Sequence, residues 1–394
     1  MKINKIIFLI ESRFTSRDYE RFGIQILQED GFVVEVWDIV CALRPFFSEK
    51  YMLLDRSNFR GLVVFDNKKK VYERLSSLSK DVMVVNLIGY CSLNLGVYRA
   101  LSCSKAYYTV FNANAIPASA TRKTGVFSLW KKYKTFTKVG VLGVWKRIMP
   151  FFPYWCLGVR AADFILVGGK MSLKSNFPIG KYTEVIYGHT LDYDIYLRER
   201  TNLSKPQEIA VFLDEFLPFH PDFEMTNEEV PVSQNKYYEQ LNSFFDLFEK
   251  NSGLKVVIAA HPRSNYESMP DFFRERKCLR GETARLVKDS QVVISHCSTS
   301  ANFAVLFNKP VVFITCSELD KSSQGPYING KAQWLGKKPI FIDNLEDGEI
   351  NWAFEKKVSE KHYYNYRISY IKIENSEETP FWKIFANRIK QGLV

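Results

Sequence analysis

Short apolar runs that alternate with amphipathic stretches dominate the C-terminal half of the chain. Three of these runs have the pattern of buried strands: Val256–Ala260, Val292–Ser295 and Val311–Thr315. Helical periodicity separates them, and a similar run, Glu208–Leu213, precedes them. Strands that alternate with helices are typical of βα units in a parallel sheet. We therefore predict an α/β domain over residues 207–345.

The N-terminal half repeats this pattern. The amphipathic stretch Asp18–Glu29 lies between two apolar runs, Ile3–Ile10 and Phe32–Ile39. Five more apolar runs have the length of strands: Gly61–Phe65, Asp81–Leu87, Ala106–Phe111, Asp163–Gly168 and Glu184–Tyr187. Because no G-x-G-x-x-G follows the first run, the usual dinucleotide fingerprint is missing. We predict a second, doubly wound α/β domain over residues 1–200, joined by the polar segment Arg198–Gln207.

The last part of the chain reads as helical. Trp352–Tyr370 and Pro380–Gly392 both have apolar residues at helical spacing. We predict that residues 346–394 pack back onto the N-terminal domain. A chain of 394 residues exceeds the size at which one hydrophobic core usually stops growing, which agrees with two domains.

The charge and the cysteines narrow the class of protein. A formal net charge of +11 suits a nucleic acid, an anionic membrane surface or an anionic substrate. Zinc-finger spacing, an RNP-like aromatic box and a Lys/Arg-rich tail are all missing, which ranks nucleic acid below the other two. The 7 cysteines form no C-x-x-C and fit reduced thiols. The first apolar run is too short for a signal peptide, so we expect a cytoplasmic protein.

The segment Thr121–Gly158 differs from the rest because basic residues interleave with tryptophan and phenylalanine. A basic, aromatic segment can lie in a membrane interface beside anionic lipid. It can equally form a surface helix pair whose aromatic side chains face the core. The sequence leaves both interpretations open, so a peripheral position at the inner face of the cytoplasmic membrane is one of two possibilities.

Polar residues follow the predicted strands of the second domain. In open α/β sheets, ligands bind beyond the carboxyl ends of the strands. An acid there can act as a general base or as a nucleophile, and imidazole, guanidinium and hydroxyl groups can meet a phosphate. We predict a nucleotide-phosphate site, of which only one acid is expected to enter the crevice, since alternation sends neighbours to opposite faces. The residues concerned are Asp214, Glu215, His261, Pro262, Arg263, Ser298, Thr299 and Ser300.

Other polar residues have two interpretations each. His296 either touches the donor or orients the turn before the next helix, and Glu282 and Thr283 either cap a helix or touch a ribose. Asp192-Tyr193-Asp194 has the D-x-D spacing of some metal sites, but we favour a turn or cap role. The 5 histidines include no i, i+4 pair, and G-x-S-x-G and the P-loop motif are missing. We expect neither a metal nor a cofactor.

At these residues the chain resembles the two-domain glycosyltransferases of the GT-B fold, over residues 208–315. More narrowly, it is similar to bacterial enzymes that use CMP-activated ulosonic acids, the sialyltransferases and Kdo transferases of capsule and lipopolysaccharide synthesis. The resemblance implies two Rossmann-like domains facing a central cleft and a metal-independent enzyme. It implies a base or nucleophile at Asp214-Glu215, a phosphate contact at His261 and phosphate or carboxylate binding at Ser298–Ser300. Some such families have glycine where this chain has Phe216.

The predicted function is the transfer of a sugar, Kdo or a sialic-type acid, from a CMP-activated donor to a bacterial surface polysaccharide or lipid-linked glycan. The same residues also fit a transferase or an epimerase that uses a UDP- or GDP-sugar. A third hypothesis, from another class, is a non-catalytic scaffold that binds membranes through residues 121–158.

Overall fold

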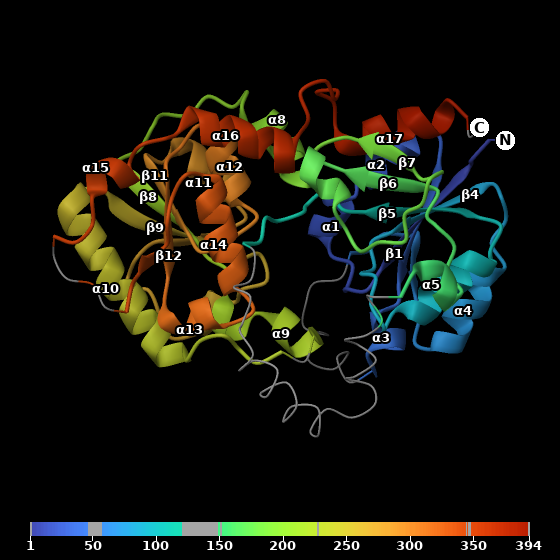
Figure 1. The fold of residues 1–394 in the computed structure, drawn as a ribbon, viewed down its shortest axis with the longest axis horizontal. Helices are drawn as coiled ribbons and strands as arrows, with labels where there is room; N and C mark the ends of the chain where they lie inside the picture. Colours follow the sequence, from blue (N-terminus) through green and yellow to red (C-terminus); the bar gives the residue numbers. More distant parts are fainter. Residues whose placement is uncertain are drawn as a thin grey trace. The chain divides into compact units, whose positions relative to one another are not determined.

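The computed structural model describes residues 2–45, 57–119, 149, 152–226, 228–343, 345 and 348–392 (Figure 1). The chain forms two compact units. Unit 1 comprises Met1–Ala113, Lys123–Leu191 and Ile373–Val394, and unit 2 comprises Asn114–Arg122 and Asp192–Lys372. Each unit contains one sheet whose strand pairs are all parallel.

The sheet of unit 1 has 7 strands in the order β3-β2-β1-β4-β5-β6-β7. Its central strands are apolar along their whole length because helices cover both faces of a parallel sheet. Phe8 on one face and Leu9 on the other are both fully buried. The strands are β1 Lys5–Ile10, β2 Val33–Asp38, β3 Leu62–Val64, β4 Val82–Asn86, β5 Tyr107–Phe111, β6 Phe164–Val167 and β7 Glu184–Tyr187.

Helices of unit 1 pack on both faces of this sheet (Figure 1). The last helix returns to the first strand: the Trp382 ring packs edge-on against Phe8 at 4.9 Å, and its indole N–H donates to the Arg21 carbonyl at 2.8 Å. The helices are α1 Ser16–Arg21, α2 Ile24–Glu29, α3 Val40–Leu43, α4 Lys68–Ser76, α5 Leu95–Cys103, η4 Tyr154–Leu157, η5 Lys170–Leu173 and α17 Phe381–Lys390.

The stretch predicted as one helix, Asp18–Glu29, is two short helices that meet at Gly23. Gly23 has φ +54°, the left-handed region that residues with a Cβ rarely adopt. A Cβ at this position would also lie 2.5 Å from Cδ1 of Trp382. The contact with the C-terminal helix therefore sets the break, and periodicity along the local sequence does not reveal it.

Gly23→Ala is expected to lower the free energy of unfolding by about 2 kcal/mol, because it adds backbone strain and a steric overlap with Trp382. Gly31→Ala is the matched control, since Gly31 has φ +89° but nothing within 4 Å of the added Cβ. Urea denaturation of both variants measures the difference. Equal losses in the two variants would contradict a role for the Trp382 contact.

The sheet of unit 2 has 6 strands in the order β10-β9-β8-β11-β12-β13. Three of them match the predicted apolar runs closely, because these strands are buried on both faces. The strands are β8 Ile209–Leu213, β9 Lys255–Ala260, β10 Cys278–Arg280, β11 Val292–Ser295, β12 Val311–Thr315 and β13 Ile340–Phe341.

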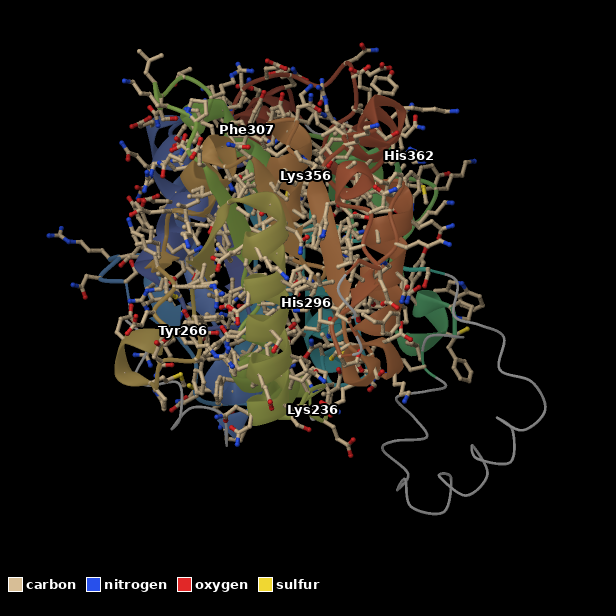
Figure 2. The ribbon with its side chains drawn as sticks, turned by 90° about the vertical axis from the view of Figure 1, so that its left-hand side faces the viewer. Lys236, Tyr266, His296, Phe307, Lys356 and His362 are labelled. Atoms are coloured by element: carbon tan, nitrogen blue, oxygen red, sulfur yellow. The ribbon has the colours of Figure 1, made fainter. Side chains whose placement is uncertain are left out.

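The longest helix among the described residues of unit 2 is α10, which covers one face of the sheet (Figure 2). Its buried aromatic side chains include Phe244, Phe245 and Phe248. Shorter helices complete both layers. The helices are α8 Leu191–Glu199, η6 Leu217–Phe219, α9 Pro221–Thr226, α10 Gln234–Ser252, η7 Tyr266–Ser268, α11 Thr283–Asp289, α12 Ala301–Leu306, α13 Ser317–Lys321, α14 Gly325–Trp334, α15 Trp352–Glu355, α16 Glu360–Tyr366 and the π-helix η8 Arg367–Ile371.

Both sheets have the doubly wound strand order in which the first and fourth strands are neighbours. The direction in which successive strands are added to the sheet reverses between β1 and β4 in unit 1 and between β8 and β11 in unit 2. Such a switch point opens a crevice beyond the strand ends. The predicted α/β class with two Rossmann-like domains is confirmed. The residues that were predicted as one C-terminal block divide: Trp352–Ile371 belong to unit 2 and α17 to unit 1.

No helix of the described ranges is both long and apolar enough to span a bilayer. The basic, aromatic segment predicted at residues 121–158 lies largely outside the described residues, since 121–148, 150 and 151 are not among them. Its two interpretations therefore stay predictions.

Candidate functional site

The strand ends at the switch point of unit 2 carry two neighbouring acids that reach in opposite directions. Asp214 and Glu215 directly follow β8, which lies between β9 and β11. Asp214 accepts a hydrogen bond from the backbone of His261, beyond β9, whereas Glu215 accepts one from the backbone of Cys297, beyond β11. The alternation of side chains thus separates the two carboxylates, as it does along a strand.

The Asp214 carboxylate is closed off by three protein donors. Its Oδ1 accepts from the Phe216 N–H at 3.0 Å and from the Tyr266 hydroxyl at 3.1 Å, and its Oδ2 accepts from the His261 N–H at 3.1 Å. Only 5% of the residue is exposed. Burial raises the pKa of Asp214 to about 6, although these hydrogen bonds act in the opposite direction. Asp214 thus ties the ends of β8 and β9 together.

Phe216 follows the acid pair, and its backbone adopts a conformation that usually favours glycine. Its φ of +52° lies in the left-handed region, which costs a residue with a Cβ about 1–2 kcal/mol. The Asp214 hydrogen bond to the Phe216 N–H holds this turn, and the ring packs edge-on against Tyr266 at 5.2 Å. The turn after the acid pair is thus kept without a glycine.

Glu215 is partly exposed and lies beyond the ends of β8 and β11. Its Oε1 accepts from the Cys297 N–H at 2.7 Å, and its Oε2 lies 3.3 Å from the Cys297 thiol, which can donate to it. Burial raises the pKa of Cys297, so this thiol stays protonated and donates. Of the two predicted acids, Glu215 is the more exposed.

A pair of histidines lies at the same edge of the sheet. The ring centroids of His220 and His261 are 4.7 Å apart, and the ring planes meet at 66°. Each belongs to a His-Pro-x turn in which Nδ1 accepts the backbone N–H two residues on, at 3.2 Å in both cases. Because Nδ1 accepts, the neutral ring carries its proton on Nε2. Both imidazoles can thus donate an N–H to an anionic oxygen without taking up a proton.

An ion pair joins the two histidine turns. Arg263 NH1 donates to Asp222 Oδ1 at 2.9 Å, which links the residues two positions after each histidine. Burial lowers the pKa of His220, and among the charges that act on it are Asp222, Arg263 and Glu215. His220 therefore lies within electrostatic reach of the Glu215 carboxylate. The imidazoles of His220 and His261 and the Glu215 carboxylate form one polar cluster.

The predicted hydroxyl cluster precedes α12 and forms a tight turn. The N–H groups of Ala301 and Asn302 donate back to the carbonyls of Ser298 and Thr299, so these two N–H groups are already used within the turn. Thr299 is exposed, and Ser298 and Ser300 are partly exposed. An anion would meet hydroxyl groups at this turn.

A buried lysine supports the hydroxyl turn from behind. Lys331 Nζ donates to the Ser298 carbonyl at 2.6 Å and to the Cys297 carbonyl at 3.2 Å, and only 1% of the residue is exposed. Burial lowers its pKa, and the charge of Glu215 raises it. Lys331 fixes the backbone between Glu215 and the hydroxyl cluster, and sequence analysis missed it because it comes from the distant helix α14.

His296 lies inside the domain and not at its surface. Its Nδ1 lies 2.8 Å from the Ile314 carbonyl and its Nε2 lies 2.9 Å from the Tyr237 hydroxyl of α10 (Figure 2). The residue is fully buried, and burial lowers its pKa. Both ring nitrogens are used within the fold, so His296 orients the end of β11 and is closed to a ligand.

The remaining predicted residues are placed as follows. Pro262 is partly exposed between His261 and Arg263. Glu282 precedes the helix α11 and pairs with Arg285, while Thr283 is the first residue of that helix. Both follow the edge strand β10, which is separated from β8 by β9. They share the sheet edge with the polar cluster, but no described contact joins them to it.

The D-x-D sequence forms the start of α8. Asp192 and Asp194 lie in the first turn, where negative charge interacts favourably with the helix dipole. Residues two apart on a helix face different directions, so the two carboxylates do not converge on one ion. Asp192 Oδ2 instead accepts from the Asn302 amide at 3.0 Å. Within the described ranges, no cluster of three or more His, Cys, Asp or Glu side chains has the geometry to hold a metal.

Comparisons with known proteins agree with the topology. No protein-family model matches the sequence, and no curated protein matches it significantly. A structure of the wall teichoic acid polymerase TagF with CDPG matches with a TM-score of 0.52 and 13% identity, over 99% of this chain and 90% of that chain.

Two other solved structures are also similar. The calicheamicin glycosyltransferase CalG4 matches with a TM-score of 0.48 and 12% identity, over 93% of each chain. UDP-GlcNAc 2-epimerase of Methanocaldococcus jannaschii, in complex with UDP-GlcNAc and UDP, matches with a TM-score of 0.46 and 10% identity, over 99% of each chain. At such identities the likeness concerns the fold alone. Together with the two strand orders, the TagF match shows that the chain has the GT-B fold.

Proposed function

We propose that the chain is a glycosyltransferase that takes a sugar from a nucleotide-activated donor. The observation that supports the proposal is the polar cluster of unit 2, in which two imidazoles whose Nδ1 atoms accept backbone N–H groups accompany the partly exposed Glu215 carboxylate at a switch point. A departing nucleotide needs donors for its phosphate, and an attacking hydroxyl needs a base. The cluster supplies both kinds of group.

In this proposal Glu215 is the base. It accepts the proton of the acceptor hydroxyl while that oxygen forms a bond to the anomeric carbon. The bond from the anomeric carbon to the donor's phosphate oxygen breaks, and its electron pair stays on the phosphate. His261 and His220 donate to that phosphate, and the hydroxyls of Ser298–Ser300 donate to its other oxygens or to a sugar carboxylate. Direct attack by Glu215 on the anomeric carbon is the retaining alternative, which NMR of the product anomer distinguishes.

For the donor we propose a CMP-linked ulosonic acid, Kdo or a sialic-type acid, and for the acceptor a bacterial surface polysaccharide or lipid-linked glycan. The order of the acidic, His-Pro and Ser/Thr motifs supports this choice, and a net charge of +11 suits an anionic sugar. The same hydrogen-bond donors, His220, His261 and the hydroxyls of Ser298–Ser300, would also bind the phosphate of a UDP- or GDP-sugar. A UDP-sugar transferase or 2-epimerase is therefore the second candidate, and the solved structures of similar fold include enzymes of that kind.

A thermal-shift panel of CMP, CDP, UDP and GDP is expected to show the largest rise in melting temperature with CMP, because a ligand that binds only the native state stabilises it. Incubation with CMP-Kdo or CMP-sialic acid should then release CMP slowly by hydrolysis. Stabilisation by UDP alone, with epimerised UDP-GlcNAc among the products, would establish the second candidate. Binding of anionic liposomes without binding of any nucleotide would instead favour the membrane scaffold.

A further inference from the structure

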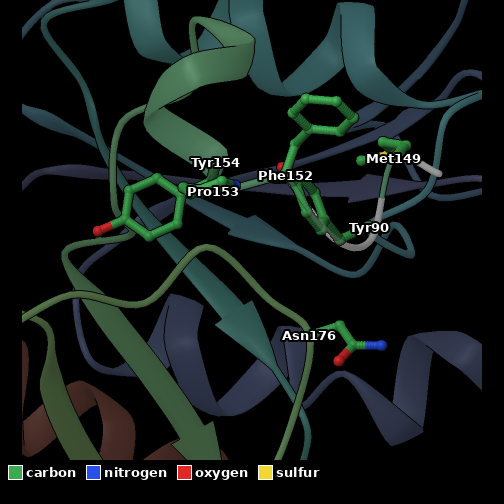
Figure 3. A pocket seen from close by; sticks show the side chains of 6 residues that line it. All are labelled: Tyr90, Met149, Phe152, Pro153, Tyr154 and Asn176. Atoms are coloured by element: carbon green, nitrogen blue, oxygen red, sulfur yellow. The ribbon is translucent and has the colours of Figure 1, made fainter.

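A small pocket in unit 1 lies close to the switch point of that unit. Its lining consists of Tyr90, Met149, Phe152, Pro153, Tyr154 and Asn176 (Figure 3). Tyr90 follows β4, Tyr154 belongs to η4 and Asn176 follows η5, so segments far apart in the sequence meet here. The pocket has a volume of about 150 Å³, which is below the ~300–1,000 Å³ of pockets for larger ligands. A single sugar ring suits this space better than a nucleotide.

The walls of the pocket are aromatic and uncharged. Three of the six lining residues carry aromatic rings, and none is acidic or basic. Aromatic faces bind the C–H faces of sugars through apolar contact, while their polar groups bind the hydroxyls. An uncharged wall disfavours a phosphate or a carboxylate, which would lose its hydration without gaining a countercharge. The occupant is therefore an uncharged sugar unit and differs from the anionic donor.

One polar group in the pocket has no partner in the protein. The Tyr90 hydroxyl is buried, and no atom of the described residues forms a hydrogen bond with it. Burial raises its pKa, and the ring is held edge-on by Tyr98 at 4.9 Å. A buried polar group without a partner costs about 1–3 kcal/mol, so such groups are rare and usually have a reason. A ligand hydroxyl would satisfy it.

A carboxylate of unit 1 binds the backbone next to Tyr90. Glu11 follows β1, and its Oε1 accepts from the N–H of Gly89, the residue before Tyr90, at 3.0 Å. Its Oε2 accepts from Arg44 at 3.0 Å and from Asn94 at 2.9 Å. The Asn94 side-chain oxygen is buried and has no hydrogen-bond partner among the described residues. These contacts hold the turn that carries Tyr90.

We propose that this pocket binds an uncharged pyranose ring of the acceptor glycan, with Tyr90 as a binding residue. Trp155 follows Tyr154 in η4, does not line the pocket and is 67% exposed, so its ring is available to a second sugar of the same glycan. This inference rests on the proposed transferase function, since it names the acceptor. It does not depend on which nucleotide carries the donor sugar.

The test uses the full chain and three variants: Tyr90→Phe, Trp155→Ala and the control Tyr182→Phe. Tyr182 is 89% exposed and lines no described pocket, so its variant matches the loss of one tyrosine hydroxyl. Saturation-transfer NMR with methyl β-D-glucopyranoside and its N-acetylglucosamine analogue measures binding. We expect Tyr90→Phe to weaken binding about tenfold, the effect of one hydrogen bond to a buried group, and Tyr182→Phe to leave binding unchanged.

Two further readouts separate this proposal from its alternatives. Without ligand, the Tyr90→Phe variant should have a melting temperature no lower than that of the wild type, because it loses a hydroxyl that has no partner. If the hydroxyl instead stabilised the fold, its removal would lower the melting temperature. CMP-induced stabilisation and donor hydrolysis should be the same in all variants. If the wild type shows neither, the proposed transferase function is wrong, while the sugar-binding result is still valid by itself. Equal sugar binding by Tyr90→Phe and Tyr182→Phe would overturn the proposal. An octyl glycoside serves as a further probe, and magnetisation transfer to its alkyl chain in place of its sugar ring would also overturn it.

Discussion

Asp214→Ala is expected to lower the free energy of unfolding by about 3 kcal/mol, because it leaves three buried donors without an acceptor. These donors are the Phe216 and His261 N–H groups and the Tyr266 hydroxyl. Urea denaturation at pH 7 measures the change, and an unchanged m-value would show that the unfolded state is the same. The control is Asp66→Ala: Asp66 is 81% exposed in an i, i+4 ion pair, so its loss should change stability by ~0.5 kcal/mol or less.

The pH dependence of the same variant tests whether Asp214 is buried as a carboxylate. Its pKa is raised from 3.8 to about 6, so the folded state binds the proton more tightly than the unfolded state. The stability that this gives is present in full below pH 3.8 and is lost as the pH rises through about 6. The difference in the free energy of unfolding between the wild type and Asp214→Ala should therefore decrease by up to about 3 kcal/mol as the pH rises between those limits.

A difference that stays constant with pH would contradict the burial of Asp214. So would a variant that unfolds within ~0.5 kcal/mol of the wild type, the range expected of a surface substitution. Either result would reopen the question of which carboxylate faces the ligand. The expected result would instead explain why a loss of turnover in an Asp214 variant cannot by itself identify a base, since the ends of β8 and β9 would have separated.

The central strands of the two sheets could be predicted from the sequence, whereas the edge strand β10 could not. β11 and β12 coincide with the predicted runs because both faces of a parallel sheet demand apolar side chains. The edge strand β10 has only 3 residues, Cys278–Arg280, all partly or fully exposed, and it was missed. An edge strand owes its existence to the neighbour that it pairs with, in this case β9.

Helix boundaries depended on contacts from distant parts of the chain. The predicted helix Trp352–Tyr370 is interrupted after α15, where Lys337 Nζ donates to the carbonyls of Phe354 and Glu355 at 2.6 and 3.0 Å. Those carbonyls would otherwise accept hydrogen bonds from the next turn of the same helix. Lys337 is almost fully buried, so this contact competes well, and periodicity within residues 352–370 gives no sign of it.

The candidate site could be predicted in its position and not in its details. Parallel strands end at one edge, which is why Asp214, Glu215 and His261 lie together. His220 was missed as a site residue, although the repeated His-Pro dipeptide at 220 and 261 was a usable signal. Its pairing with His261 is accompanied by the ion pair between Asp222, at the start of α9, and Arg263, in the turn after β9. The closure of Asp214 and His296 depends on tyrosines that come from other elements, Tyr266 and Tyr237.

Glu215→Gln is expected to reduce turnover by about 10²–10⁴-fold, the usual contribution of a general base. Glutamine keeps the side-chain length and can still accept the Cys297 N–H through its remaining oxygen, so the turn after β11 should keep its shape. The melting temperature and the CMP-induced shift should therefore stay close to those of the wild type. An equal fall in kcat and kcat/KM would mark an interaction made in the transition state.

The matched control for Glu215→Gln is Cys297→Ala, which removes the thiol beside Oε2 but leaves the carboxylate and the backbone N–H in place. If the carboxylate acts on the acceptor, this variant should retain most of the wild-type turnover. If Glu215 only fixes the turn that carries Ser298–Ser300, Glu215→Gln should also retain most of the wild-type turnover, since its remaining oxygen still accepts the Cys297 N–H. The two variants thus decide between a base and a structural acceptor at the switch point of unit 2.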